Sequence, residues 1–116
     1  MMKINNPQSF NVINKIYNQE NQRAEYYILG LEDWAFFDTI LSFLKKSYGV
    51  EVQSFSDGII TRKYELLYQG ECFTLEHHGD IGNYFYGIQK SRFLEEIAND
   101  FEEKLKDIPF SKEVEL

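Results

Sequence analysis

The segment from Tyr64 to Ile88 constrains the fold of this chain more than any other. Two strand-like runs flank Gln69-Gly70, and the second run leads into the polar loop 77–83 and then into the aromatic triplet 84–86. Alternating apolar and polar residues are typical of half-buried strands, and a short glycine-containing pair between two such runs marks a turn. We therefore expect a hairpin within a sheet, followed by a loop that presents polar and aromatic side chains.

Side-chain alternation along these strands divides the predicted sheet into two faces. Tyr84 and Tyr86 share one face, and Phe85 lies on the other. In the preceding run the same rule groups Phe73, Leu75 and His77 on one face, and Cys72, Thr74, Glu76 and His78 on the other. One face is expected to pack, while the other presents aromatic hydroxyl groups.

Two amphipathic helices are also predicted. In the first, apolar residues recur at spacings of three and four from Phe37 to Tyr48, after the acidic pair 32–33 and before Gly49, and two lysines occupy the last turn. The second helix begins near Ser91, a good N-cap, and carries an apolar stripe through Leu94, Ile97, Phe101, Leu105 and Ile108 until Pro109 stops it.

Further strands are predicted over 10–17, 26–29, 50–55 and 60–68, with a turn at 56–58. The order of strands and helices predicts a single α+β domain with an antiparallel sheet of about five or six strands and two main amphipathic helices. The domain is expected to span 10–108, between an N-terminal segment, 1–9, and a C-terminal tail, 109–116. A chain of 116 residues with 43% hydrophobic content can bury a core without disulfides or metal.

The charge balance restricts the class of partner. Twelve Lys and Arg residues stand against 19 Asp and Glu residues, which gives a net charge of −7. Affinity for phosphate backbones comes largely from Lys and Arg, and the basic residues here are scattered, so nucleic acid, anionic membrane and acidic protein are all disfavoured as partners. The single cysteine, the absence of a signal-peptide pattern and the absence of a long apolar run favour a soluble, cytoplasmic protein.

No convincing catalytic set is found, so we expect the protein not to be an enzyme. Cys72 and His77 would project from opposite faces of one strand. Cys72 and His78 would share a face but lie roughly 20 Å apart on a straight strand, beyond hydrogen-bond reach. The thiol is better explained as a small hydrophobic side chain.

No cofactor or metal is predicted either. Glu76, His77, His78 and Asp80 have ligand chemistry, but the two histidines diverge, and a zinc site needs three or four convergent ligands. The glycines around the loop lack the lysine of a phosphate-binding loop. They are better explained by a turn or bulge, in which Asp80 and Asn83 also tolerate left-handed backbone geometry.

The last helix is the densest negative element of the chain. Its acidic residues have a simple explanation as a solvated face that keeps a small domain soluble. Combined with the overall charge and the aromatic triplet, they favour a module that docks onto a basic protein, because opposite potentials speed encounter.

The chain resembles small bacterial immunity proteins of contact-dependent growth inhibition and related polymorphic toxin systems. The resemblance rests on the order of elements, the hairpin around Gln69-Gly70, the stretch Asp80-x-Gly82-Asn83-Tyr84 and the acidic last helix, over residues 24–108. It implies an antitoxin that binds a cognate toxin domain, often a basic nuclease, and occludes its active or substrate-binding site without a cofactor.

The partner-binding residues are inferred from their chemistry, since no motif of the family fixes them. They are Asp80, Asn83, Tyr84, Tyr86, Glu95, Glu96, Asp100, Glu102 and Glu103. Two alternatives stay open: a small enzyme that uses Cys72 or the His77/His78 loop, and an acidic mimic of nucleic acid. The sequence leaves the oligomeric state and the identity of the toxin open.

Overall fold

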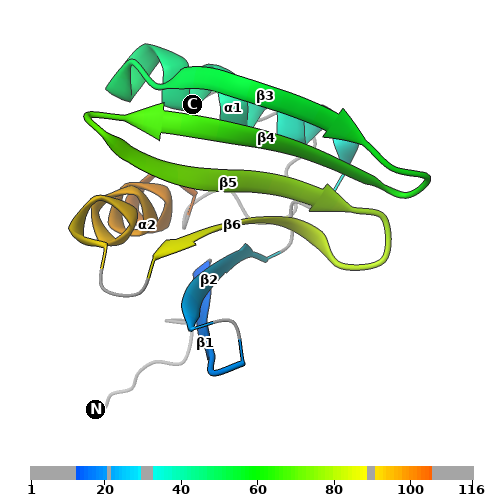
Figure 1. Ribbon diagram of the computed structural model, residues 1–116, viewed down its shortest axis with the longest axis horizontal. Coiled ribbons are helices and arrows are strands. Elements are labelled where there is room, and N and C mark those ends of the chain that lie inside the picture. The colour runs from blue at the N-terminus through cyan, green and yellow to red at the C-terminus, as the bar shows by residue number, and fades with distance from the viewer. Residues whose placement is uncertain (1–12, 21, 30–32, 89–90, 106–116) are drawn as a thin grey trace.

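The computed structural model of the chain describes residues 13–20, 22–29, 33–88 and 91–105 (Figure 1). The predicted segments 1–9 and 109–116, the strand start at 10–12, and the helix end at Ile108 and Pro109 lie outside these residues. The elements, in chain order, are β1 (Ile13–Asn18), β2 (Arg23–Ile28), α1 (Trp34–Tyr48), β3 (Glu51–Asp57), β4 (Thr61–Tyr68), β5 (Glu71–His78), β6 (Gly82–Ile88) and α2 (Arg92–Leu105).

The strands form one six-stranded sheet in the order β1-β2-β6-β5-β4-β3, and every neighbouring pair is antiparallel. The predicted α+β class is confirmed, as a single domain. The hairpin at Gln69-Gly70 is confirmed too, with φ of 47° and 84°, which are the two positive values that a tight two-residue hairpin turn requires. The predicted central position of the strand at Leu66 is also confirmed, because β4 lies between β3 and β5 and Leu66 is fully buried.

Both helices begin where the sequence indicates an N-cap, and α1 also ends at its predicted glycine. The Asp33 side chain accepts a hydrogen bond from the Phe36 amide at 2.9 Å, and Gly49 closes α1 in the left-handed conformation with φ of 69°. Ser91 Oγ accepts from the Leu94 amide at 3.2 Å, as expected of an N-cap. Of the helices in the described part of the chain, none is long and apolar enough to cross a membrane.

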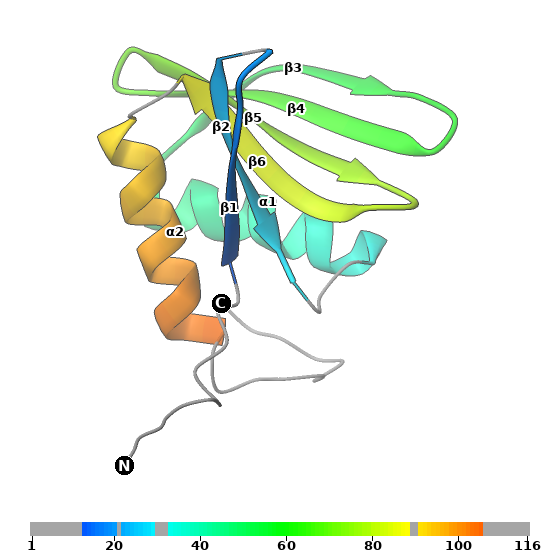
Figure 2. The ribbon, with the colours of Figure 1, turned by 90° about the horizontal axis from the view of Figure 1, so that it is seen from below.

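The two helices pack on the same face of the sheet (Figure 2). Phe43 of α1 contacts Phe101 of α2, and Phe101 contacts Phe85 of β6, with ring centroids 5.1 and 6.1 Å apart. Phe85 in turn stacks on Tyr26 of β2 at 5.0 Å. This aromatic chain joins both helices to the middle of the sheet and defines the core.

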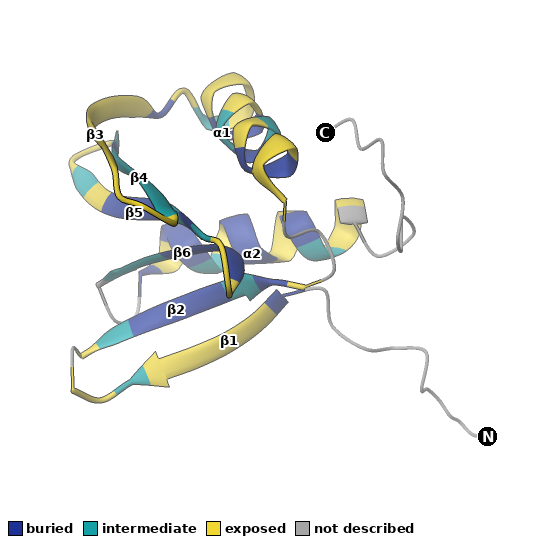
Figure 3. Cartoon of the chain, turned by 90° about the vertical axis from the view of Figure 1, so that its right-hand side faces the viewer, coloured by how far each residue is buried: buried dark blue, intermediate teal, exposed yellow. Residues whose placement is uncertain are grey.

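The opposite face of the sheet has no helix over it, and we call it the helix-free face (Figure 2). The two edge strands are the least buried parts of the sheet (Figure 3). Every residue of β3 is exposed, and its register with β4 shifts between Val52 and Ser54, which marks a bulge at Gln53.

Candidate protein-binding surface

Three tyrosines from adjacent strands form a row on the helix-free face. Tyr27 of β2 stacks on Tyr84 of β6 with ring centroids 4.9 Å apart, and Tyr84 lies 5.9 Å from Tyr86. Tyr27 and Tyr84 meet because they are direct register partners. The sequence predicts that Tyr84 and Tyr86 share one face and that Phe85 lies on the other. The structure confirms this, because Tyr84 contacts Tyr86 and Phe85 stacks in the core.

Two carboxylates are held in place by the tyrosine hydroxyl groups. Glu25, which is 6% exposed, accepts a hydrogen bond from Tyr27 Oη at 2.7 Å and another from Arg23 Nε at 2.7 Å. Glu76 accepts from Tyr86 Oη at 2.8 Å. Each carboxylate is therefore fixed by groups on the sheet itself. Glu25 is buried and paired with Arg23, whereas Glu76 is half-buried and keeps part of its charge at the surface.

The pKa values of these tyrosines keep the hydroxyls protonated in neutral solution. Burial, together with the hydrogen bond to Glu25, raises the pKa of Tyr27 to about 12. Burial and a hydrogen bond to Glu76 raise the pKa of Tyr84 and of Tyr86 well above the ordinary range. The hydroxyls therefore act as hydrogen-bond donors to the carboxylates and do not compete with them as charges.

A shallow open depression of about 300 Å³ adjoins this row. Glu65 lies in it and accepts a hydrogen bond from Thr74 Oγ1 at 2.5 Å. The Arg23 guanidinium lies over the Tyr86 ring at 3.7 Å, so its charge is held by an aromatic face as well as by Glu25. The other lining residues are Gln22, Cys72, Phe73 and Gly87.

The acidic residues of α2 do not form a uniform outward-facing surface. Glu95 pairs with Lys15 and accepts from Tyr26 Oη, and Glu102 Oε1 accepts from the Ile13 amide at 2.5 Å. Asp100 accepts a hydrogen bond from Tyr48 of α1. These three carboxylates bind α2 to the first hairpin and to α1, while Asp100, Glu96 and Glu103 are exposed. Glu95, Asp100 and Glu102 thus have contacts within the protein, and the expectation that all five carboxylates face a partner stays a prediction.

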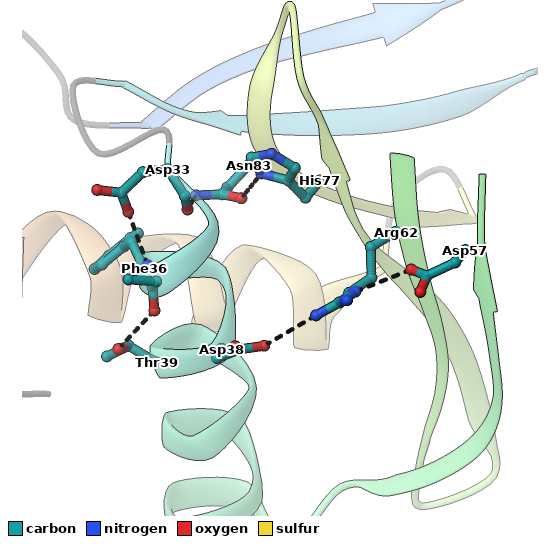
Figure 4. Close-up of polar contacts among 9 residues, drawn as sticks. Asp33, Phe36, Asp38, Thr39, Asp57, Arg62, His77 and Asn83 are labelled. Atoms are coloured by element: carbon teal, nitrogen blue, oxygen red, sulfur yellow. Dashed lines mark hydrogen bonds and ion pairs between the residues drawn. The ribbon is translucent and has the colours of Figure 1, made fainter. Parts of the chain in front are cut away.

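Asn83 also differs from its expected role. It is 1% exposed, and its amide accepts a hydrogen bond from His77 Nδ1 at 2.7 Å and donates to the Asp33 carbonyl at 3.3 Å (Figure 4). Because an amide oxygen can only accept, Nδ1 of His77 carries the proton in this contact. Asn83 thus ties the start of α1 to the sheet and leaves no side-chain surface for a partner. Asp80, by contrast, is exposed in the β5–β6 turn.

The residues considered for catalysis are kept apart. His77 is buried on the helix-covered face and Cys72 is exposed on the other, as strand alternation predicts. His78 accepts a hydrogen bond from the Asp80 amide through Nδ1 at 3.0 Å, within its own turn. Among the residues that the structure describes, no group of three His, Cys, Asp or Glu side chains could hold a metal ion.

Sequence reasoning missed Glu25, Tyr27 and Arg23 as members of the helix-free face. The signal was present, because three polar residues alternate with apolar Ala24 and Tyr26 through β2. Only the pairing of β2 with β6, in which Tyr27 meets Tyr84 57 positions later in the chain, brings that polar set beside Tyr84 and Tyr86. Local pattern alone does not give such a pairing.

The fold and the site define a small antiparallel α+β protein whose open sheet face is aromatic and acidic. Comparison of the chain with protein-family models, with curated proteins and with solved structures found no match.

Proposed function

We propose that the protein is a non-catalytic inhibitor of the immunity type, which acts in the bacterial cytoplasm. It binds a basic toxin domain and covers that domain's active or substrate-binding site. The helix-free face is the single observation that best supports this proposal, because it combines aromatic side chains with carboxylates that are already oriented.

Such preorganisation matters for affinity. Ordering a long side chain at an interface costs about 0.5–1.5 kcal/mol, which lowers the net free energy of binding. Glu76 is half-buried and is already ordered by the Tyr86 hydroxyl, so it can receive a Lys or Arg side chain at a smaller entropic cost. Tyrosine is also among the residue types enriched at interface hot spots.

The net charge of −7 supports the same kind of partner. A negative protein attracts a basic domain over distances up to about a Debye length, ~8 Å at physiological salt, and this raises the association rate. Occlusion needs no bond-making step, which agrees with the separation of Cys72 from both histidines described above.

The decisive experiment uses the polypeptide encoded next to this gene. We expect that its C-terminal domain is toxic when expressed alone, that co-expression of this protein removes the toxicity, and that the two copurify. A neighbouring product that is harmless alone, or that forms no complex by titration calorimetry, would contradict the proposal.

A matched pair of variants then tests the face. Glu65→Gln removes one charge from the depression, and Glu96→Gln removes one charge from the exposed surface of α2, on the helix-covered side of the sheet. We expect Glu65→Gln to weaken the complex at least fivefold more than Glu96→Gln, a difference of about 1 kcal/mol. Equal effects would mean that only total charge matters and that the helix-free face is not the interface.

A further inference from the structure

Exposed apolar side chains gather at one end of the sheet, where the β3–β4 and β5–β6 turns meet. The Gly79 amide donates a hydrogen bond to the Ile60 carbonyl at 2.7 Å and joins the two turns. Ile59 is fully exposed at this tip, and Ile60 and Ile81 are each nearly half exposed. On the helix-covered side, Trp34 and Phe55 continue the apolar surface. We call these five residues the apolar end.

Arg62 lies between the two aromatic rings of the apolar end. Its guanidinium carbon is 4.5 Å from the Trp34 ring centroid and 5.4 Å from that of Phe55. Asp57 accepts a hydrogen bond from Arg62 Nε at 3.0 Å, and Asp38 lies 3.9 Å from the guanidinium (Figure 4). The arginine is therefore held against both aromatic rings, and its charge is offset by two carboxylates.

The rings are supported from beneath by buried His77 and partly buried Tyr64. Trp34 stacks on His77 at 4.3 Å, and Phe55 contacts Tyr64 at 4.9 Å. Trp34 and Phe55 nevertheless remain 44% and 48% exposed. Rigid aromatic side chains that are fixed on one side and open on the other lose little conformational entropy when a partner covers them.

The surroundings of the apolar end are acidic. Asp38 and Asp57 flank Arg62, the N-cap residue Asp33 precedes Trp34, and Asp80 precedes Ile81, and all four aspartates are exposed. An apolar centre with a charged rim is the usual organisation of a protein–protein interface, and Trp and Arg are the residue types most enriched among hot spots. Here all four rim residues are negatively charged, which favours a positively charged partner.

We propose that the apolar end is the energetic anchor of the complex with the basic toxin domain, an inference that rests on the proposed function. The occupant is a segment of that domain with an apolar centre flanked by Lys or Arg. Its apolar side chains cover Trp34, Phe55 and the three isoleucines, and its cations face the aspartate rim. The β3–β4 and β5–β6 turns lie between the apolar end and the helix-free face, so one partner that covers these turns contacts both surfaces.

The test measures binding of a catalytically inactive form of the neighbouring toxin domain to variants of the full chain by titration calorimetry. Ile59→Ser is the first variant, because its side chain is fully exposed and its loss leaves folding intact. Phe55→Ser is the second. Its matched control is Tyr17→Ser. Tyr17 is 41% exposed and lies on the other edge strand, β1, at the end of the sheet opposite the apolar end.

We expect Phe55→Ser to weaken binding at least about thirtyfold, the scale of a hot spot, and Ile59→Ser about fivefold. Tyr17→Ser should change the dissociation constant less than about threefold. Thermal melting of each variant identifies any loss that arises from unfolding. If Phe55→Ser and Ile59→Ser bind as tightly as the wild type, the anchor is elsewhere and the inference is overturned, although the proposed function stands. If the wild-type chain does not bind, both are overturned.

Discussion

Tyr26 on β2 donates a hydrogen bond to Glu95 on α2, with 2.7 Å between Oη and Oε2. Lys15 of β1 pairs with the same oxygen. The pairing with Lys15 and the hydrogen bond from Tyr26 hold the pKa of Glu95 below its ordinary value. A carboxylate whose position on an acidic helix suggests a partner contact thus joins that helix to the first hairpin.

Glu95→Gln is expected to lower the free energy of unfolding by about 1 kcal/mol at pH 7, because it removes a charged acceptor from Lys15 and Tyr26. Glu96→Gln, one residue along the same helix and exposed, is the control and should have little effect. Since the folded-state pKa of Glu95 is depressed, its contribution is present above the ordinary pKa of 4.5 and disappears as the pH falls through the folded-state value. Urea denaturation at pH 7 and at pH 3 measures both effects, and equal stability of the two variants at pH 7 would contradict the assignment.

Asn83→Ala is expected to cost about 1–3 kcal/mol, because it leaves buried His77 Nδ1 without its acceptor. Asn99→Ala, at an exposed position of α2, is expected to change stability by less than about 0.5 kcal/mol. Chemical denaturation of both variants measures the difference. If Asn83→Ala lost no more stability than Asn99→Ala, the hydrogen bond between His77 and Asn83 would not contribute to the stability of the fold.

Gly87→Ala is expected to destabilise the protein by about 1–3 kcal/mol through overpacking. A Cβ atom there would lie 2.8 Å from Leu94 Cδ1 on α2 and 3.3 Å from Phe73 Cβ on β5. At Gly79 the nearest atoms to a Cβ are 3.5 Å away, so Gly79→Ala is the tolerated control. Thermal melting distinguishes them, and two equal melting temperatures would contradict the packing argument.

Alkaline titration should reveal the hydrogen-bonded tyrosines. Burial raises the pKa of Tyr27 to about 12 and raises those of Tyr26, Tyr48, Tyr84 and Tyr86 further above their ordinary value of 10.0. A raised folded-state pKa contributes stability that is present below pH 10 and is lost as the pH rises towards the folded-state value. We expect most of the phenolate absorbance at 295 nm to appear only together with the loss of circular dichroism. Ionisation of all eight tyrosines near pH 10 in the folded protein would exclude these contacts.

Local features of the fold were predictable because each depends on a few adjacent residues. Gln69-Gly70 turns the chain through positive φ, Gly49 ends the first helix, and Ser91 begins the second. Boundaries were less accurate. The third strand extends to Asp57, and the fourth begins at Thr61, which leaves Ile59 and Ile60 in the turn.

The candidate site was only partly predictable, because its contacts join distant segments. Alternation correctly grouped Tyr84 with Tyr86, but the Lys15–Glu95 and Asn83–Asp33 contacts span 80 and 50 residues. Whether an acidic helix residue points to solvent or to a neighbouring strand depends on how that helix is docked. Helical periodicity gives the apolar face and does not give this docking.

The bulge at Gln53 affects how this domain behaves when it is crowded. A neighbouring molecule that tried to add its own strand beside β3 would meet an interrupted series of backbone donors and acceptors and would lose register at that point. Edge-to-edge growth of the sheet through β3 is thereby discouraged, although Phe55 is openly displayed on this outermost strand.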